Sequence, residues 1–275
     1  MRTGSIKPFV LLGLALVFAA IYLFPLYWMY VTAFKSGGEI FAFPPSFWPT
    51  DPQWQFGRIF AEHAMDRYLW NSLLIAMGTT ALATLIGTGA AYALSRHRNA
   101  WTAVALFLVL MLQVLPPSLM VTPIFVAFSQ VGLLETPRAA VVLAQTAKVL
   151  PLYIVLCRST FLQVPRELED AARVDGASRI GAFLRIMIPL ARNGILVVSV
   201  LIFLQSFGEY VYSRSLIAAE NLQTATVGLS SFMGPNTNDW GGTMTYAAIY
   251  VTPILVVFAL LQRRIVSGLT AGALK

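Results

Sequence analysis

Six long apolar stretches dominate the chain, and shorter polar segments separate them. They cover residues 9–33, 71–95, 101–131, 139–161, 190–213 and 246–262. A helix of about 20 apolar residues crosses roughly 30 Å of hydrocarbon, so each stretch is long enough to span a bilayer. Because a backbone in lipid must satisfy its own hydrogen bonds, the pattern predicts an all-α membrane protein with six transmembrane helices in one domain, residues 1–275.

The basic residues predict the orientation of these spans. Of the 19 Lys and Arg residues, Lys148 lies inside the fourth span and most others flank the spans on one side. The opposite side holds only Lys35, Arg58, Arg67, Arg138 and Arg214. Since cytoplasmic loops carry the excess of basic residues, we expect both termini to be cytoplasmic. The net charge of +7 then reflects topology and attraction to anionic lipid, not nucleic-acid binding.

A charged segment, PRELEDAARVDGASRIGAFLRIMIPL at residues 165–190, interrupts the apolar pattern. So many charges cannot lie in hydrocarbon, which predicts a cytoplasmic loop with its own structure and a polar partner. Arg166 to Val174 favours a short helix with carboxylates in its first turn, and Gly176 is placed to end it. Ser178 can then cap a second short helix.

The same segment carries a family resemblance. Asp170, Ala171 and Ala172, then Gly176, then Ile186 and Pro189 resemble the "EAA, Gly, Ile-x-Leu-Pro" signature of membrane permeases in binding-protein-dependent ABC importers. Asp170 replaces the usual Glu and Ile188 replaces the usual Leu, and both changes keep the chemistry. The resemblance implies the type I importer permease fold, in which two short coupling helices, here about residues 166–187, meet at right angles and the first docks on a cytoplasmic ATPase subunit.

The ATPase-docking residues follow from this resemblance. Ala171 and Ala172 offer a small surface that another protein can approach closely, and the flanking charges can fix its register. The alternative is an ordinary solvated loop. The expected docking set is Glu167, Glu169, Asp170, Ala171, Ala172, Arg173, Asp175, Gly176 and Ala177.

Two further segments resemble carbohydrate-type permeases. The last external loop, residues 216–245, is long for a simple connection and rich in turn residues. It resembles the loop of maltose-type permeases that enters the sugar site of the external binding protein, although a loop without contacts is the alternative. The expected contacts are Met233, Gly234, Pro235, Asn236, Asn238 and Trp240. The C-terminal segment 263–275, ending in GLTAGALK, resembles the cytoplasmic tail that contacts the ATPase dimer.

Polar residues inside the spans are candidates for a solute pathway, because such residues are costly in lipid and usually face the bundle interior. Gln205, Glu209 and Ser213 recur at helical spacing on the fifth span, and Tyr210 could contact an apolar sugar face. The alternative is that Lys148 and Glu209 neutralise one another or a partner subunit, and that the glutamines hold helices together. The candidate set is Gln113, Gln145, Lys148, Gln205, Glu209, Tyr210 and Ser213.

The chemistry of an enzyme is not visible in this sequence. Cys157 is the single cysteine, His63 and His97 fall on opposite sides of the membrane, and no nucleotide-binding glycine loop or nucleophile elbow is present. We therefore expect a non-catalytic chain without a cofactor or metal of its own. ATP and Mg would be bound by partner ATPase subunits.

The resulting hypothesis is a permease subunit of a prokaryotic cytoplasmic (inner) membrane that imports a di- or oligosaccharide or related polyol. Its expected partners are membrane lipid, a second homologous permease, two ATPase subunits and an external solute-binding protein. A permease of the same architecture for another solute, such as glycerol phosphate, remains an alternative. An ion-driven secondary transporter is a weaker one, since we find neither an internal repeat nor an intramembrane carboxylate cluster.

Overall fold

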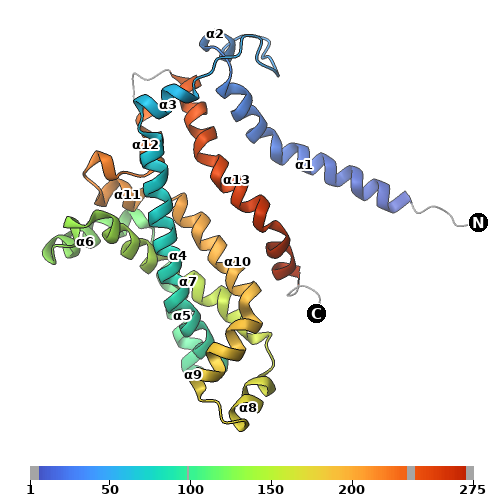
Figure 1. The fold of residues 1–275 in the computed structure, drawn as a ribbon, viewed down its shortest axis with the longest axis vertical. Coiled ribbons are helices and arrows are strands. Elements are labelled where there is room, and N and C mark those ends of the chain that lie inside the picture. The colour runs from blue at the N-terminus through green and yellow to red at the C-terminus, as the bar shows by residue number, and fades with distance from the viewer. Residues whose placement is uncertain (1–5, 98, 234–238, 271–275) are drawn as a thin grey trace, which may run out of the picture. The chain divides into compact units, whose positions relative to one another are not determined.

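The computed structural model describes residues 6–97, 99–233 and 239–270, and every regular element among them is helical (Figure 1). Among these residues, five helices are long and apolar enough to cross a membrane, and a bent helix pair counts as a sixth span if the two helices cross as one. The predicted all-α fold is therefore confirmed, and the candidate spans in the described part of the chain number five, or six when the bent pair is counted as one span. The longer helices are α1 (Ile6–Ala33), α4 (Met65–Arg96), α5 (Ala100–Val114), α6 (Pro117–Gln130), α7 (Pro137–Leu162), α10 (Ile188–Phe207) and α13 (Trp240–Thr270).

Short helices connect them. These are α2 (Gly37–Ile40), α3 (Phe56–Glu62), η1 (Leu133–Glu135), α8 (Arg166–Val174), α9 (Arg179–Ala182), the π-helical turn η2 (Phe183–Met187), α11 (Val211–Leu216), η3 (Glu220–Leu222), α12 (Ala225–Ser230) and η4 (Ser231–Met233). The described residues form two compact units. One belongs to Met1–Asp66 and Gly228–Pro253, and the other to Arg67–Val227 and Ile254–Lys275.

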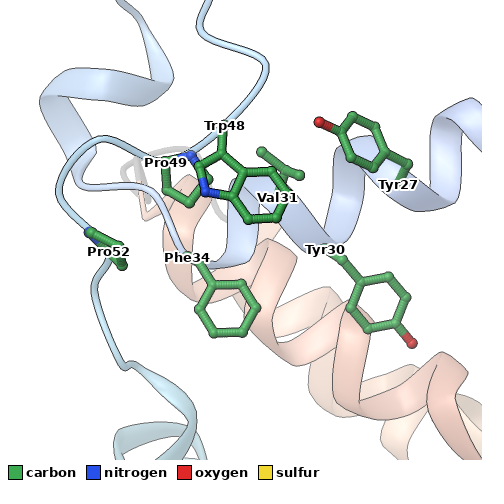
Figure 2. Close-up of a pocket in the computed structure, with 7 residues that line it drawn as sticks. All are labelled: Tyr27, Tyr30, Val31, Phe34, Trp48, Pro49 and Pro52. Atoms are coloured by element: carbon green, nitrogen blue, oxygen red, sulfur yellow. The ribbon is translucent and has the colours of Figure 1, made fainter.

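In the first unit, the proline-rich segment after α1 is ordered by polar contacts. The Lys35 side chain is buried, donates from Nζ to the Ser46 carbonyl at 2.5 Å, and lies 4.4 Å from the Trp28 ring centroid. Glu39 accepts hydrogen bonds from Ser46 Oγ and Thr50 N, both at 2.8 Å. An apolar pocket of about 390 Å³ lies between the end of α1 and this segment (Figure 2), lined by Tyr27, Tyr30, Val31, Phe34, Trp48, Pro49 and Pro52.

In the second unit, α4, α7 and α10 form the core through close contact at small residues. Tyr153 of α7 is fully buried, and its hydroxyl is 2.8 Å from Thr88 Oγ1 of α4. A Cβ at Gly87 would overlap the Tyr153 ring, so only glycine lets this ring lie against α4. Thr84 Oγ1 contacts Ser199 Oγ of α10 at 2.9 Å. Small residues and short hydroxyls therefore join the three helices.

The stretch predicted as one span over 101–131 is divided into two helices. α5 ends at Val114, α6 begins at Pro117, and the two are bent by 95°. Pro116 and Pro117 cause the break, because proline lacks an amide donor and forces the preceding residue out of the helical region. Leu115 accordingly has an extended backbone, with ψ of 119°. The prolines predict a bend here, and the structure shows a complete break.

The last two spans also differ from the sequence pattern. The stretch 190–213 is interrupted, since α10 ends at Phe207 and α11 starts at Val211. The segment from residue 263, expected as a separate cytoplasmic tail, continues α13 as helix to Thr270. Residues 271–275 lie outside the described residues. Apolar content alone places a span, but it does not locate the breaks or ends of its helix.

Candidate functional site

The charged segment folds as two short helices whose ends are fixed locally. Gly176 has φ of +89°, a backbone conformation that glycine adopts without strain. Ala177 N donates to the Ala172 carbonyl at 2.9 Å and Gly176 N to the Arg173 carbonyl at 3.1 Å, which closes the end of α8. Ser178 Oγ accepts from Gly181 N at 3.0 Å and caps α9. The predicted helix bounds, glycine stop and serine cap are confirmed.

The expected docking residues divide between two faces of α8. Ala172 is 7% exposed, and Glu169, three residues earlier, lies on the same inward side. Ala172 is thus buried, contrary to the expectation that both alanines present a surface. Ala177 is half-buried. The exposed members are Glu167, Asp170, Ala171, Arg173, Asp175 and Gly176.

Large apolar side chains are exposed on the same two helices and on η2, which follows them. Val174 is 88% exposed and Ile180 is 71% exposed, and Leu168 and Leu184 are also exposed. Sequence reasoning missed these four residues because it considered only charges and alanines. The feature of the sequence that could have identified them is the presence of branched apolar side chains within a segment too charged for lipid. An exposed apolar surface rimmed by charges is typical of an interaction site.

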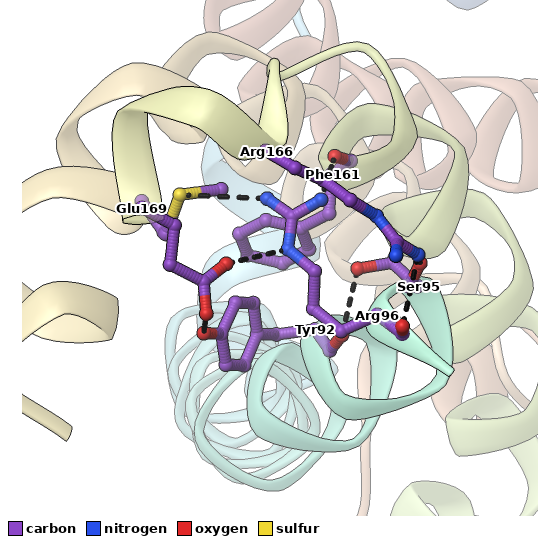
Figure 3. A network of polar contacts seen from close by, with 7 residues as sticks. Tyr92, Ser95, Arg96, Phe161, Arg166 and Glu169 are labelled. Carbon is purple, nitrogen blue, oxygen red and sulfur yellow. Dashed lines mark hydrogen bonds and ion pairs between the residues drawn. The ribbon is translucent and has the colours of Figure 1, made fainter. Parts of the chain in front are cut away.

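The inward face of α8 is bound to the end of α4 (Figure 3). Glu169 accepts from Tyr92 OH at 2.5 Å and from Arg96 Nε at 2.8 Å. The Arg96 and Glu169 side chains are 12% and 14% exposed. Arg166 donates to the carbonyls of Ser95 and Arg96 at 3.3 and 2.8 Å, which satisfies carbonyls at the end of α4. We call Tyr92, Arg96, Arg166 and Glu169 the α4–α8 junction.

The junction also reaches neighbouring elements. Arg96 donates to the Phe161 carbonyl at the end of α7 and contacts Met187 Sδ of η2, each at 3.4 Å. The Tyr92 ring lies 4.6 Å from the Phe183 ring. Sequence reasoning missed Tyr92 and Arg96. Their spacing at i and i+4 places them on one face of the last turns of the second span, and this spacing could have indicated a shared contact. A cavity of about 330 Å³ beside them is lined by mixed charges, including Asp170, Arg173 and Arg179.

Three pathway candidates meet in one polar cluster. Gln145 is 2% exposed, accepts from Thr79 Oγ1 at 3.4 Å and from Ser206 Oγ, and donates from Nε2 to Glu209 Oε2 at 3.1 Å. Glu209 also accepts from Tyr212 N at 2.7 Å and from Ser213 N and Oγ, both at 3.1 Å. The Glu209 carboxylate thus caps α11 directly after α10 ends. The expected continuous stripe through Ser213 is wrong, since the helix breaks at Gly208.

The remaining pathway candidates lie apart from this cluster. Lys148 Nζ donates to the carbonyls of Gln113 and Leu115 at 3.0 and 2.7 Å, at the break between α5 and α6. Lys148 therefore binds backbone carbonyls and is not the partner of Glu209, contrary to the alternative of mutual neutralisation. Gln205 and Tyr210 are exposed. The break and the cluster are two separate polar sites.

The expected binding-protein loop is described only at its edges. Gly234, Pro235, Asn236 and Asn238 lie outside the described residues. Met233 ends η4, and Trp240 starts α13 with 48% of its surface exposed. Within the first unit, Asp239 caps α13 through Gly242 N at 2.7 Å and pairs with Arg58 Nη2 at 2.6 Å. One end of the loop is thereby fixed to α3.

These features define a class of protein. The described part of the chain is a helical membrane protein with two spans broken at polar sites and an exposed two-helix element between α7 and α10. Such an element, held to the spans on one face and apolar on the other, is suited to binding a protein outside the membrane. The class is that of multi-span helical membrane proteins with a docking element outside the membrane.

Comparisons with known proteins identify the family. The model of the binding-protein-dependent transport system inner membrane component matches residues 83–270. The trehalose/maltose transport system permease protein of Thermococcus litoralis is 31% identical over 100% of this chain and 99% of its own. The sulfoquinovosyl glycerol permease protein of Agrobacterium fabrum is 31% identical, and a diacetylchitobiose uptake permease protein of Streptomyces coelicolor is 32% identical. The match covers 92% of this chain in both, and 89% and 91% of the respective relatives.

The fold has a counterpart among solved structures. A chain of the bacterial ABC transporter that imports the acidic polysaccharide alginate superposes with a TM-score of 0.76 over 96% of this chain and 98% of that chain, at 21% identity. This likeness shows the fold. The chain belongs to the family of binding-protein-dependent transport system inner membrane components, and the resemblance inferred from residues 165–190 is confirmed.

Proposed function

We propose that this chain is the permease subunit of an ABC importer for a carbohydrate or related polyol, and that α8 and α9 dock on a partner ATPase subunit. The observation that carries the proposal is the exposed face of these helices, where Val174 and Ile180 stand out among charged side chains. The relatives named for trehalose/maltose, diacetylchitobiose and sulfoquinovosyl glycerol transport support the carbohydrate class.

The proposed assembly contains four further proteins. A second homologous permease, two ATPase subunits that bind ATP and Mg, and an external solute-binding protein complete the importer. Family membership supports the dependence on a binding protein. The distribution of basic residues supports cytoplasmic termini and a cytoplasmic position for α8 and α9. Hydrolysis occurs in the partners, and this chain converts their movement into opening and closing of the pathway.

Docking combines apolar burial with charge pairing. Burying an exposed valine or isoleucine against a partner contributes on the order of 1.5–3 kcal/mol per side chain. Glu167, Asp170, Arg173 and Asp175 surround these residues and can pair with opposite charges on the ATPase. In this arrangement the apolar side chains supply affinity, and the charges fix the register of the two proteins.

The polar sites within the spans take different roles in the proposed pathway. The exposed side chains of Gln205 and Tyr210 supply an amide and an aromatic face, which together suit a sugar. The cluster of Gln145, Glu209 and Ser213 holds α11 in place after α10. Lys148 fixes the break after Gln113 and so sets the course of α6. The loop from Met233 to Trp240 contacts the binding protein.

The test is ATP hydrolysis by the co-purified complex in lipid nanodiscs. The panel contains maltose, trehalose, diacetylchitobiose and glycerol 3-phosphate, each with the solute-binding protein encoded with the importer. The proposal predicts that the loaded binding protein stimulates hydrolysis severalfold for one of the sugars. Stimulation by glycerol 3-phosphate alone would overturn the carbohydrate class. A chain that retains no ATPase and supports no stimulated hydrolysis would overturn the importer function itself.

A further inference from the structure

We propose that the α4–α8 junction transmits the movement of α8 to α4, so that Tyr92, Arg96 and Glu169 are positioning residues for transport. This inference rests on the proposed docking of α8. It goes beyond docking because it names a span that is not adjacent to α8 in the sequence. The spans directly before and after the two-helix element are α7 and α10.

The charges at the junction are largely shielded from water. Most of α8 is exposed, yet its Glu169 is 14% exposed and is bound by both Tyr92 OH and Arg96 Nε. Separating an ion pair that is largely shielded from water leaves uncompensated charge, which is unfavourable. When a partner displaces α8, moving the end of α4 with it therefore costs less free energy than breaking these bonds.

The end of α4 is held by residues from several other elements. Arg166 of α8 binds the carbonyls of Ser95 and Arg96, while Arg158 of α7 binds the Leu94 carbonyl at 3.1 Å. Arg96 itself contacts the Phe161 carbonyl and Met187 Sδ. The last turn of α4 is thus fixed to α7, α8 and η2 together, and these elements form one connected unit.

α4 is bound again at its other end. Asn71 Nδ2 donates to the carbonyls of Asn221 and Gln223 at 3.1 and 2.9 Å, and Arg138 Nη2 donates to Asn71 Oδ1 at 2.7 Å. A helix from Asn71 to Arg96 extends about 38 Å at 1.5 Å per residue, enough to cross the bilayer. A shift imposed at the junction can therefore reach the segment around Asn221 on the opposite side.

The test measures uptake per ATP hydrolysed by the whole complex in proteoliposomes, with the panel sugar that stimulates hydrolysis most. The variants are Glu169→Gln, Arg96→Gln, Tyr92→Phe and the charge exchange Arg96→Glu with Glu169→Arg. Matched controls are Glu135→Gln, an exposed glutamate between α6 and α7, and Tyr22→Phe, an exposed tyrosine of α1. Retention of the ATPase is measured in parallel, so that loss of assembly is separated from loss of transmission.

We expect Glu169→Gln and Arg96→Gln to retain the ATPase and to lower uptake per ATP by about tenfold, within the range of coupling effects between sites. The charge exchange should recover most of this loss, because it restores an ion pair between the end of α4 and α8. Tyr92→Phe removes one hydroxyl and keeps the ring packing, so it should assemble normally and act in the same direction with a smaller effect.

Two results would overturn the inference while the proposed function stands. One is wild-type uptake per ATP in Tyr92→Phe and Glu169→Gln. The other is a charge exchange that is no better than the single variants. If the wild-type complex itself shows no hydrolysis stimulated by the loaded binding protein, the proposed function fails, and this inference fails with it.

Discussion

At the scale of single residues, glycine and short hydroxyls determine how closely the helices pack. Gly87 lies under the Tyr153 ring, and Thr88 binds the Tyr153 hydroxyl. In lipid, helices gain little from burying apolar surface, so close packing and interhelical hydrogen bonds carry much of the association. The contact between α4 and α7 therefore depends on the absence of a side chain at one position.

Gly87→Ala should destabilise the protein by about 1–3 kcal/mol, because the added methyl group overlaps the Tyr153 ring. The measurement is the midpoint of thermal unfolding in detergent. Gly89→Ala is the matched control on the same helix, since a Cβ there meets nothing within 4 Å. The control should be neutral or slightly stabilising. Equal midpoints for the two variants would contradict this account of the α4–α7 contact.

At the scale of elements, the breaks in two spans are the features that sequence periodicity does not reveal. Apolar content is similar on both sides of Leu115 and of Gly208, so both stretches read as continuous spans. The first break follows from two prolines, and Lys148 occupies the carbonyls that the break leaves without helical donors. At the second, the Glu209 carboxylate accepts from the first amides of α11. Each break is thus stabilised by one ionisable side chain.

Lys148→Met should destabilise the break between α5 and α6, because the carbonyls of Gln113 and Leu115 lose their charged donor. A hydrogen bond to a charged group contributes roughly 1.5–3 kcal/mol, so the expected loss is about 2 kcal/mol. Thermal unfolding in detergent measures it. Lys148→Arg keeps the charge and the donors and should retain most of the stability. A methionine variant that unfolds at the wild-type temperature would show that Lys148 does not hold the break.

At the scale of the whole molecule, the sequence predicts what depends on neighbouring residues and misses what depends on distant ones. The bounds of α8, the stop at Gly176 and the cap at Ser178 follow from local backbone chemistry. The positions of the candidate spans follow from apolar length. The Arg96–Glu169 pair joins residues 73 positions apart, and neither residue's own surroundings in the sequence specify the partner. For the same reason the inward position of Ala172 was not predicted.

The central claim is that the exposed face of α8 and α9 docks on an ATPase subunit. The most direct test is the amount of ATPase retained when a tagged permease carrying Val174→Asp is purified from membranes. Burial of a carboxylate in the contact should lower retention and stimulated hydrolysis by about tenfold or more. Val131→Asp, at a valine after α6 that is 74% exposed, is the control and should retain the ATPase. Full retention and full stimulated hydrolysis in Val174→Asp would contradict the account.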